Sequence, residues 1–338
     1  MPTTTMHDSL FSTPRRATPL TLAHDFPFDP TGGYTPEQLR TLKPEIEEPA
    51  DFDAFWRATF EEAMRTPLDW KIRPSDHPGT EEVEVFDIEF ASMIGGRVGG
   101  WLTRPRGRPA TRGAVLTHGY GGRAAPELAP PFSDAVIIQP VLTGLPERSL
   151  DPRIRLADGG HVIHGIESRE TYAHRWCTAD VWRAASVLHE IAPEIKHGRL
   201  HYYGGSFGGG IGALALPWDS RFHSAHLNVP SFGNHPLRLQ LPCSGSGERV
   251  RDYAKEHPEV IKVLQYFDSA IAARRIKIPV HVAAALFDPA VPPAGQFSVY
   301  HMLGGPKRLF ELSAGHFDHP LCVDEKLPLP EDLKRFFE

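Results

Sequence analysis

A serine flanked by glycines is the residue best placed for nucleophilic chemistry. Residues 200–210 read LHYYGGSFGGG and set Ser206 in a G-x-S-x-G pentapeptide between a short apolar strand and a glycine-opened helix. In such an elbow the turn is so tight that glycine is needed two residues before and after the serine, and the hydroxyl is exposed. The helix N-terminus also favours developing negative charge. The pattern predicts a nucleophile; a glycine-rich turn with an incidental serine is the alternative.

An acid and a histidine follow Ser206 in the chain order that a triad on such an elbow requires. Asp288 follows the apolar segment 279–286 within LFDPAVPP, and His316 lies in SAGHFDHP after a short strand expected at 308–312. A neutral imidazole at His316 would take the serine proton, while Asp288 fixes its tautomer and stabilises the imidazolium. We therefore predict Ser206 as nucleophile, His316 as general base and Asp288 as orienting acid.

Other residues compete for these roles. An Asp before a Pro is a frequent turn former, so Asp288 has a structural alternative, and Asp268 is the rival acid. The chain has 18 histidines, which makes any single one weak evidence, and His319 is the rival base. His316, Asp318 and His319 could together suggest a metal cluster, but no C-x-x-C or second histidine pair completes a coordination shell. Chain order and strand-end positions favour the triad, and we predict no metal site.

A glycine-containing loop offers donors for an oxyanion hole. Residues 117–122, THGYGG, follow the apolar strand expected at 114–116, where hydrolases with this elbow carry such a loop. A tetrahedral intermediate places charge on the former carbonyl oxygen and needs preorganised donors. We predict that the backbone N–H groups of Tyr120 and Phe207 supply them; a plain strand-to-helix loop is the alternative.

The order of expected elements predicts the fold. An arm rich in Pro and Thr is expected over residues 1–50, and one domain over 51–338, which opens with a helix containing FDAFW. An antiparallel hairpin at 84–90 and 98–103 is followed by apolar strands that alternate with helical patterns. These strands are expected at 114–116, 135–138 and 280–286, and the helices at 177–191 and 209–216. Such alternation favours a mostly parallel sheet with helices on both faces, and with the elbow it predicts an α/β-hydrolase fold.

Composition excludes several classes of partner. The 338 residues carry a formal net charge of -6 without a run of five or six Lys or Arg, so nucleic acid is not an expected partner. The first twenty residues lack the apolar core of a secretory signal, and no stretch approaches the length of a membrane span, which predicts a soluble, cytoplasmic protein. Cys177, Cys243 and Cys322 are odd in number and far apart, so we expect thiols rather than disulfides.

Beyond the triad, the chain resembles the acetyl xylan esterase and cephalosporin C deacetylase family, carbohydrate esterase family seven, over nearly its whole length. The shared segments are FDAFW, HGYGG, GHVIHGI, GGSFGGG and ALFDPAVPP with GGPKRLFELSAGH. The resemblance implies hydrolysis of acetyl esters on small sugars or related alcohols without a cofactor. It also implies a homo-oligomer, often a cyclic hexamer whose active sites face an internal cavity.

Two positions depart from that family. Phe207 stands where members usually carry Gln just after the nucleophile, which keeps the backbone donor but makes the side-chain environment apolar. The family's Arg-Gly-Gln motif, expected after the second core strand, is missing from residues 139–144, QPVLTG. Both differences leave the triad intact, and they point to a divergent branch with another ester substrate.

The leading hypothesis is a serine carboxylesterase that removes acetyl or other short acyl groups from a small-molecule ester through an acyl-serine intermediate. An amidase, thioesterase or lactonase would use the same triad, and a non-catalytic binding protein could keep the same fold. An apolar and aromatic set is expected either to form the pocket wall and limit acyl size or to lie in the core. Its members are Trp218, Phe222, Val229, Phe232 and His235.

Overall fold

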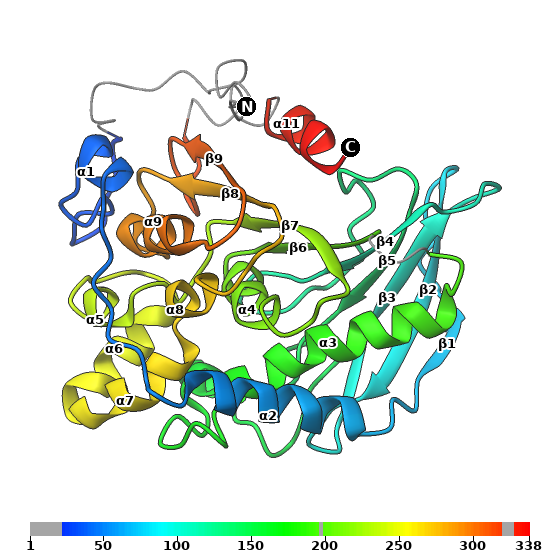
Figure 1. The fold of residues 1–338 in the computed structure, drawn as a ribbon, viewed down its shortest axis with the longest axis horizontal. Helices are drawn as coiled ribbons and strands as arrows, with labels where there is room; N and C mark the ends of the chain where they lie inside the picture. Colours follow the sequence, from blue (N-terminus) through cyan, green and yellow to red (C-terminus); the bar gives the residue numbers. More distant parts are fainter. Residues whose placement is uncertain (1–21, 196–198, 320–327) are drawn as a thin grey trace, which may run out of the picture.

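The computed structural model describes residues 22–195, 199–319 and 328–338, and its centre is a twisted sheet (Figure 1). In the described chain this sheet has nine strands in the order β1-β2-β3-β5-β4-β6-β7-β8-β9. The strands are Lys71–Pro74 (β1), Val83–Ala91 (β2), Arg97–Pro105 (β3), Arg112–Leu116 (β4), Ala135–Pro140 (β5), Leu200–Gly205 (β6), Phe222–Asn228 (β7), Val280–Ala285 (β8) and Lys307–Leu312 (β9).

Helices connect and cover these strands. The α-helices are Pro36–Arg40 (α1), Phe52–Arg65 (α2), Ala173–Ile191 (α3), Phe207–Ala215 (α4), His235–Arg238 (α5), Ser246–Glu256 (α6), Ile261–Leu264 (α7), Ser269–Ala273 (α8), Pro293–Met302 (α9) and Pro328–Phe337 (α11). Short 3-10 helices span Ala157–Ile163 (η1), Pro258–Val260 (η2) and Gln265–Phe267 (η3). Within the described residues, no helix combines the length and the apolar character that crossing a membrane requires.

Strand directions confirm the predicted fold. Strands β5, β4, β6, β7, β8 and β9 pair in parallel, whereas β1, β2 and β3 pair antiparallel to one another and β3 pairs antiparallel to β5. The chain leaves β4 toward β5 on one side and returns to β6 on the other. Such a switch point leaves a crevice at the carboxyl ends of the strands, where ligand sites of open α/β sheets form. The loops after β4 and β6 carry residues 117–122 and Ser206.

Both faces of the sheet are covered, also as predicted. Side chains alternate along β4, so that Val115 enters the main core with α3 and α4. Ala114 and Leu116 point to the other face and pack with Leu333 and Phe337 of α11. Figure 1 shows α11 (red) apart from α2, α3 and α4.

Strand β7 was not predicted, because its sequence FHSAHLN lacks an apolar run. His226 is fully buried within it, and its Nδ1 lies 3.0 Å from Nδ1 of His281 on β8. His281 Nε2 in turn lies 2.9 Å from a carboxylate oxygen of Asp332 on α11. The pairing gives each of these buried side chains a polar partner, although His226 Nε2 has none in the described chain, and a partner on another strand cannot be inferred from local sequence.

The described part of the predicted arm lies against the body. Helix α1 begins with a capping box at Thr35, and Leu39 is fully buried. Arg40 forms a bidentate salt bridge with Glu311 on β9, and each of the two N–O distances is 2.7 Å. The division into an arm over 1–50 and a domain over 51–338 stays a prediction. Of the cysteines, Cys177 and Cys243 are buried free thiols, and Cys322 lies outside the described residues.

A buried arginine joins α3 to the sheet and to α2. Arg183 is fully buried, and its guanidinium donates to four carbonyl oxygens. The acceptors are those of Ala63, Thr66, Pro67 and Ala91, at 2.7–2.9 Å. A buried guanidinium is stable when its donors are satisfied in this way.

We predict that Arg183→Met lowers the free energy of unfolding by about 3–5 kcal/mol, because the buried carbonyls lose their donors. Urea unfolding at neutral pH measures this change. Arg65→Ala is the control, since the exposed Arg65 pairs with Glu61 at 2.8 Å on α2 and such a surface pair contributes at most about 1 kcal/mol. Equal losses in the two variants would contradict the account.

Candidate active site

Ser206 lies at a strained turn between β6 and α4. Its backbone angles are φ 54° and ψ -114°, a region that residues with a side chain rarely adopt. Backbone carbonyl groups lie very close to this turn, which explains why glycines stand on either side of Ser206. A Cβ on Gly204 would lie 2.6 Å from the Gly208 carbonyl oxygen, and one on Gly208 would lie 2.8 Å from the His118 carbonyl oxygen. The Ser206 N–H donates to the Asn228 carbonyl at 2.8 Å, which ties the turn to the end of β7.

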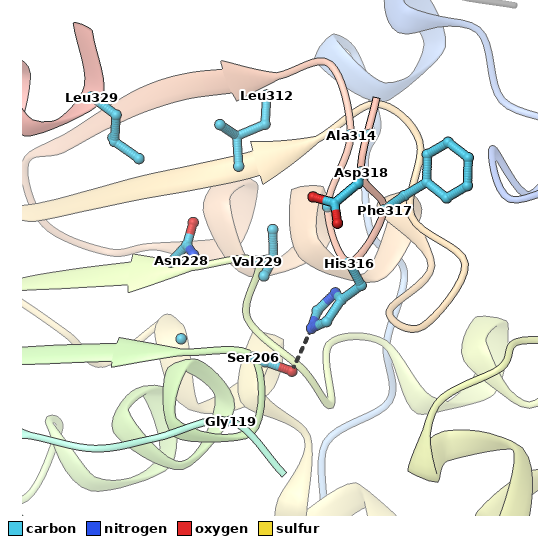
Figure 2. Close-up of a pocket in the computed structure, with 12 residues that line it drawn as sticks. Gly119, Ser206, Asn228, Val229, Leu312, Ala314, His316, Phe317, Asp318 and Leu329 are labelled. Carbon is cyan, nitrogen blue, oxygen red and sulfur yellow. Dashed lines mark hydrogen bonds between the residues drawn. The ribbon is translucent and has the colours of Figure 1, made fainter. Parts of the chain in front are cut away.

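The structure brings the three predicted triad residues together. His316 Nε2 lies 3.0 Å from Ser206 Oγ, as Figure 2 shows, and His316 Nδ1 lies 2.9 Å from Asp288 Oδ2. Ser206 follows β6, Asp288 follows β8 and His316 follows β9, so all three sit at the carboxyl ends of parallel strands of one sheet, with β7 between β6 and β8. Burial lowers the pKa of His316, but the hydrogen bond and charge of Asp288 outweigh burial and raise that pKa above its usual value.

The Asp288 carboxylate is held by several donors besides His316. It is 1% exposed, and its Oδ1 accepts from the N–H groups of Ala290 and Val291, each at 2.9 Å. The side-chain amide of Gln296 on α9 donates to Oδ2 at 2.9 Å. These bonds offset the cost of burying the charge and fix the direction of the carboxylate toward the imidazole.

Residues of the N-terminal arm contact the acid and histidine loops. The Asp288 N–H donates to the Pro30 carbonyl at 3.0 Å. The ring of Phe26 packs edge-on against Phe317 at 5.9 Å between ring centres, and Phe317 lies 5.1 Å from Phe287. The arm therefore supports both loops that complete the triad.

The loop after β4 lies against the start of α4, as an oxyanion hole requires. The Gly208 N–H donates to the His118 carbonyl at 2.9 Å, and the Tyr120 ring packs edge-on against Phe207 at 5.4 Å between ring centres. Phe207 opens α4, so its N–H belongs to the first turn, which lacks intrahelical acceptors. Tyr120 and Phe207 contact each other at the start of α4, and their role as oxyanion donors stays a prediction.

His118 holds this loop in place as a neutral side chain. Burial lowers its pKa to about 4. Its Nε2 then accepts from the Leu142 N–H at 3.0 Å, which leaves Nδ1 to donate to the Gly119 carbonyl at 2.7 Å. Leu142 belongs to residues 139–144, so this segment supports the predicted oxyanion loop.

A cavity of about 620 Å³ opens beside Ser206 and His316 (Figure 2). Its walls are mainly apolar and come from the ends of β6, β7 and β9 and from α11. The lining residues are Gly119, Gly205, Ser206, Asn228, Val229, Leu312, Ala314, Gly315, His316, Phe317, Asp318 and Leu329. This volume suits a small ester.

The apolar and aromatic set was expected either at the pocket wall or in the core, and the structure places its members in both. Val229 lines the cavity. Phe222 and Phe232 are buried in the core, where Phe232 packs on Phe207. His235 is buried on α5, and Trp218 packs against Phe52 of α2. The core reading therefore holds for most of the set.

The rival residues have other surroundings. Asp268 is fully buried and caps α8, accepting from the N–H groups of Ala270, Asn234 and His235 at 2.7–3.0 Å. Burial raises its pKa to about 6. His319 is buried, and it is His316 that meets Asp288. A search of residues 22–195, 199–319 and 328–338 finds no group of three or more His, Cys, Asp or Glu side chains arranged to hold a metal ion.

Sequence reasoning missed Gln296 and Asn228. Gln296 is fully buried in α9 and links Asp288 to the Ala285 N–H, which its Oε1 accepts at 2.8 Å. A polar side chain inside the apolar segment PAGQF is the signal that could have found it. Asn228 ends β7, which was itself not predicted.

Comparison with known proteins identifies relatives over most of the chain. A family model described as acetyl xylan esterase (AXE1) matches residues 34–321. The curated protein "Acetyl esterase Axe7A" of Xylanibacter ruminicola is 24% identical over 285 residues, which are 81% of this chain and 64% of that protein. The match thus spans less than two thirds of that relative's length.

Solved structures share the fold. The acetyl xylan esterase from Paenibacillus sp. R4 superposes with a TM-score of 0.77 at 24% identity, covering 88% of this chain and 98% of the other. Acetyl xylan esterase 1 from Thermoanaerobacterium sp. JW/SL YS485 gives a TM-score of 0.74 at 20% identity, with the same coverage of 88% and 98%. At these identities the likeness is evidence for the fold.

We predict that Gly208→Ala lowers the free energy of unfolding by about 1–3 kcal/mol, because the new Cβ would crowd the His118 carbonyl. Gly205→Ala is the matched control in the same turn: its Cβ would meet Asn228 Nδ2 at 3.7 Å, an ordinary contact, so we expect a change below about 1 kcal/mol. Urea midpoints report both values. A stable Gly208→Ala protein would show that the elbow is not packed as described.

Proposed function

Because the chain belongs to the acetyl xylan esterase family, we propose that it is a serine carboxylesterase that removes acetyl or other short acyl groups from an alcohol or sugar. The observation that carries the proposal is the continuous chain of contacts from Ser206 Oγ through His316 to Asp288 beside the cavity. In this proposal Ser206 is the nucleophile, His316 the general base and Asp288 the residue that orients it.

The acylation step follows from this geometry. Ser206 Oγ attacks the ester carbonyl carbon while its proton passes to His316 Nε2, 3.0 Å away. The backbone N–H groups of Tyr120 and Phe207 donate to the oxygen that gains negative charge. The intermediate then collapses, the bond to the alcohol oxygen breaks, and His316 returns its proton to the departing alcohol. The acyl group stays on Ser206 as an ester.

Deacylation repeats these steps with water. His316 Nε2 takes a proton from a water molecule, whose oxygen attacks the acyl carbon. When the second intermediate collapses, the proton returns to Ser206 Oγ and the carboxylic acid is released. The scheme uses side chains, backbone donors and water, and it needs no cofactor.

The proposal also covers the substrate, the oligomeric state and the location of the protein. A small-molecule ester suits the apolar, 620 Å³ cavity, and Val229 and Leu312 on its wall limit the size of the group beside the serine. A homo-oligomer such as a hexamer, a cytoplasmic location and the absence of nucleic-acid or membrane partners stay predictions.

We predict that the protein hydrolyses p-nitrophenyl acetate faster than the butyrate and octanoate, and that Ser206→Ala lowers kcat/KM for the acetate at least about 10³-fold. Assays in EDTA measure both. Ser186→Ala is the control, because Ser186 lies on α3 and its Oγ donates to the Trp182 carbonyl in the helix. Turnover that persists in Ser206→Ala would overturn the nucleophile assignment. Turnover of matched amides or thioesters but not of esters would replace the esterase by another hydrolase.

The pH dependence tests His316 and Asp288. The neutral imidazole is the active form, so kcat/KM falls as the pH drops below the raised pKa of His316. Asp288→Asn removes the charge that raises this pKa and leaves the burial that lowers it. We therefore predict that the acidic limb of the pH–rate profile moves to lower pH, while the plateau falls about 10⁴-fold. An acidic limb that does not move would show that it reports another group.

A further inference from the structure

Arg238 is a buried cation without a partner among the described residues. This last residue of α5 is 6% exposed, and its Nε is sealed from solvent with no hydrogen-bond acceptor. None of the ion pairs or side-chain hydrogen bonds of the described chain includes its guanidinium. Arg183 shows how this protein otherwise buries a guanidinium, with four carbonyl acceptors. In Arg238 only Nε is sealed, so the two terminal Nη groups remain accessible from outside while no acceptor of the described chain meets them. A largely buried guanidinium whose fork stays open and unpaired can accept a ligand that supplies the missing acceptors.

The Arg238 guanidinium lies against the first turn of α6. A Cβ placed on Gly247 would overlap Nη2 of Arg238, so the glycine leaves the room that the guanidinium occupies. The N-cap of α6 is Gly245, which offers no side-chain acceptor to the first N–H groups. The uncapped helix terminus and the guanidinium therefore present positive charge to the same place.

Glu248, the acidic residue in the first turn of α6, already has a hydrogen-bond donor and an ion-pair partner. Glu248 accepts from the Cys243 N–H at 3.0 Å through Oε2, and its Oε1 pairs with Arg251 at 2.6 Å. Arg251 also keeps a buried Nε without a hydrogen-bond partner. Glu248 therefore pairs with Arg251, and the charge of Arg238 is left without an ion-pair partner among the described residues.

The segments that lead into α5 and α6 are hydrogen-bonded to residues of the proposed active site, although no residue of either helix lines the cavity beside Ser206. Helix α5 follows the loop in which the Ser231 N–H donates to the Ser206 carbonyl at 3.1 Å, and before α6 the Ser244 N–H donates to the Pro289 carbonyl at 2.6 Å, next to Asp288. Burial raises the pKa of the Cys243 thiol, Arg238 lowers it and Asp288 raises it, so both charges act on this one side chain. Helix α5 packs against α9, and Figure 1 shows the two helices on the same side of the molecule.

We propose that Arg238 and the first turn of α6 form an anion-binding subsite that holds a carboxylate group of the ester substrate. The planar guanidinium fork matches a carboxylate, and the terminal N–H groups of α6 complete its coordination. The proposal rests on the esterase function and narrows its substrates to esters that carry a carboxylate on the acyl or the alcohol part.

Paired substrates test this proposal. Mono-p-nitrophenyl glutarate is compared with p-nitrophenyl pentanoate, which places the carboxylate in the acyl part, and 4-acetoxybenzoate with its methyl ester, which places it in the alcohol part. For at least one pair we expect the wild-type kcat/KM to be about tenfold or more higher for the carboxylate, mainly through a lower KM. Arg238→Met should lower that ratio at least tenfold, and Gly247→Ala, which displaces the guanidinium, should lower it as well.

The control is Arg249→Met, because Arg249 is an exposed arginine on α6 and its loss changes the net charge equally. We expect it to keep the wild-type ratio. Glutarate should raise the melting temperature of Ser206→Ala but not of the Ser206→Ala, Arg238→Met double variant, which reports binding without turnover. Replacing an unpaired buried charge by Met should not lower the melting temperature, so misfolding is detectable separately.

Two outcomes would overturn the subsite: no preference for the carboxylate in either pair, or a preference that survives in Arg238→Met. Both can occur while neutral esters are still hydrolysed through Ser206, in which case the esterase proposal stands. If the wild type hydrolyses none of the four esters but glutarate still raises the melting temperature through Arg238, the subsite stands and the esterase proposal fails.

Discussion

The burial of the Asp288 carboxylate is the constraint on which the arrangement of the site depends. An ionised carboxylate that is 1% exposed needs several donors, and no single segment of the chain can provide them. Here its own turn supplies two N–H groups, α9 supplies Gln296 and the loop after β9 supplies His316. The parallel strands β8 and β9 must therefore be neighbours with matched register, and α9 must pack beside them. The placement of the imidazole near Ser206 is a consequence of this packing.

Asp268 shows why burial alone does not make a catalytic acid. It too is fully buried and accepts from backbone N–H groups, and burial raises its pKa to about 6. Its donors all belong to the N-terminal ends of α5 and α8, so its charge stabilises two helix termini. Asp288 differs because one side of its carboxylate remains directed at a histidine in the loop after another strand. The two carboxylates therefore differ in the direction of the oxygen lone pair that no backbone N–H occupies. That direction depends on the tertiary fold.

Local patterns in the sequence predicted the nucleophile, and chain order predicted its partners. Ser206 could be found because the steric demands of an elbow involve residues two positions away, and Asp288 and His316 because each follows an apolar strand in a fixed order. Arg238 could not be found in this way, and Gln296 offered only the local signal of a polar side chain within an apolar segment. Their roles depend on contacts with Asp288 and Gly247, which lie on other elements, and a polar residue in a helix has many possible roles until its neighbours are known. Strand β7 was missed for the same reason, since the pairing of His226 with His281 replaces the apolar run that marks a buried strand.

The contacts of the N-terminal arm also set an order of events during biosynthesis. Pro30 and Phe26 leave the ribosome long before Asp288 and Phe317, which they contact. At a synthesis rate of about 5–20 residues per second, roughly 13–50 s separate the two ends of this contact. Throughout that interval the aromatic residues of the arm have no docking surface, and the loops that hold the acid and the histidine do not yet exist. The nascent chain therefore assembles its site late, because the arm can dock only after the last strands of the sheet and the loops that follow them have been made.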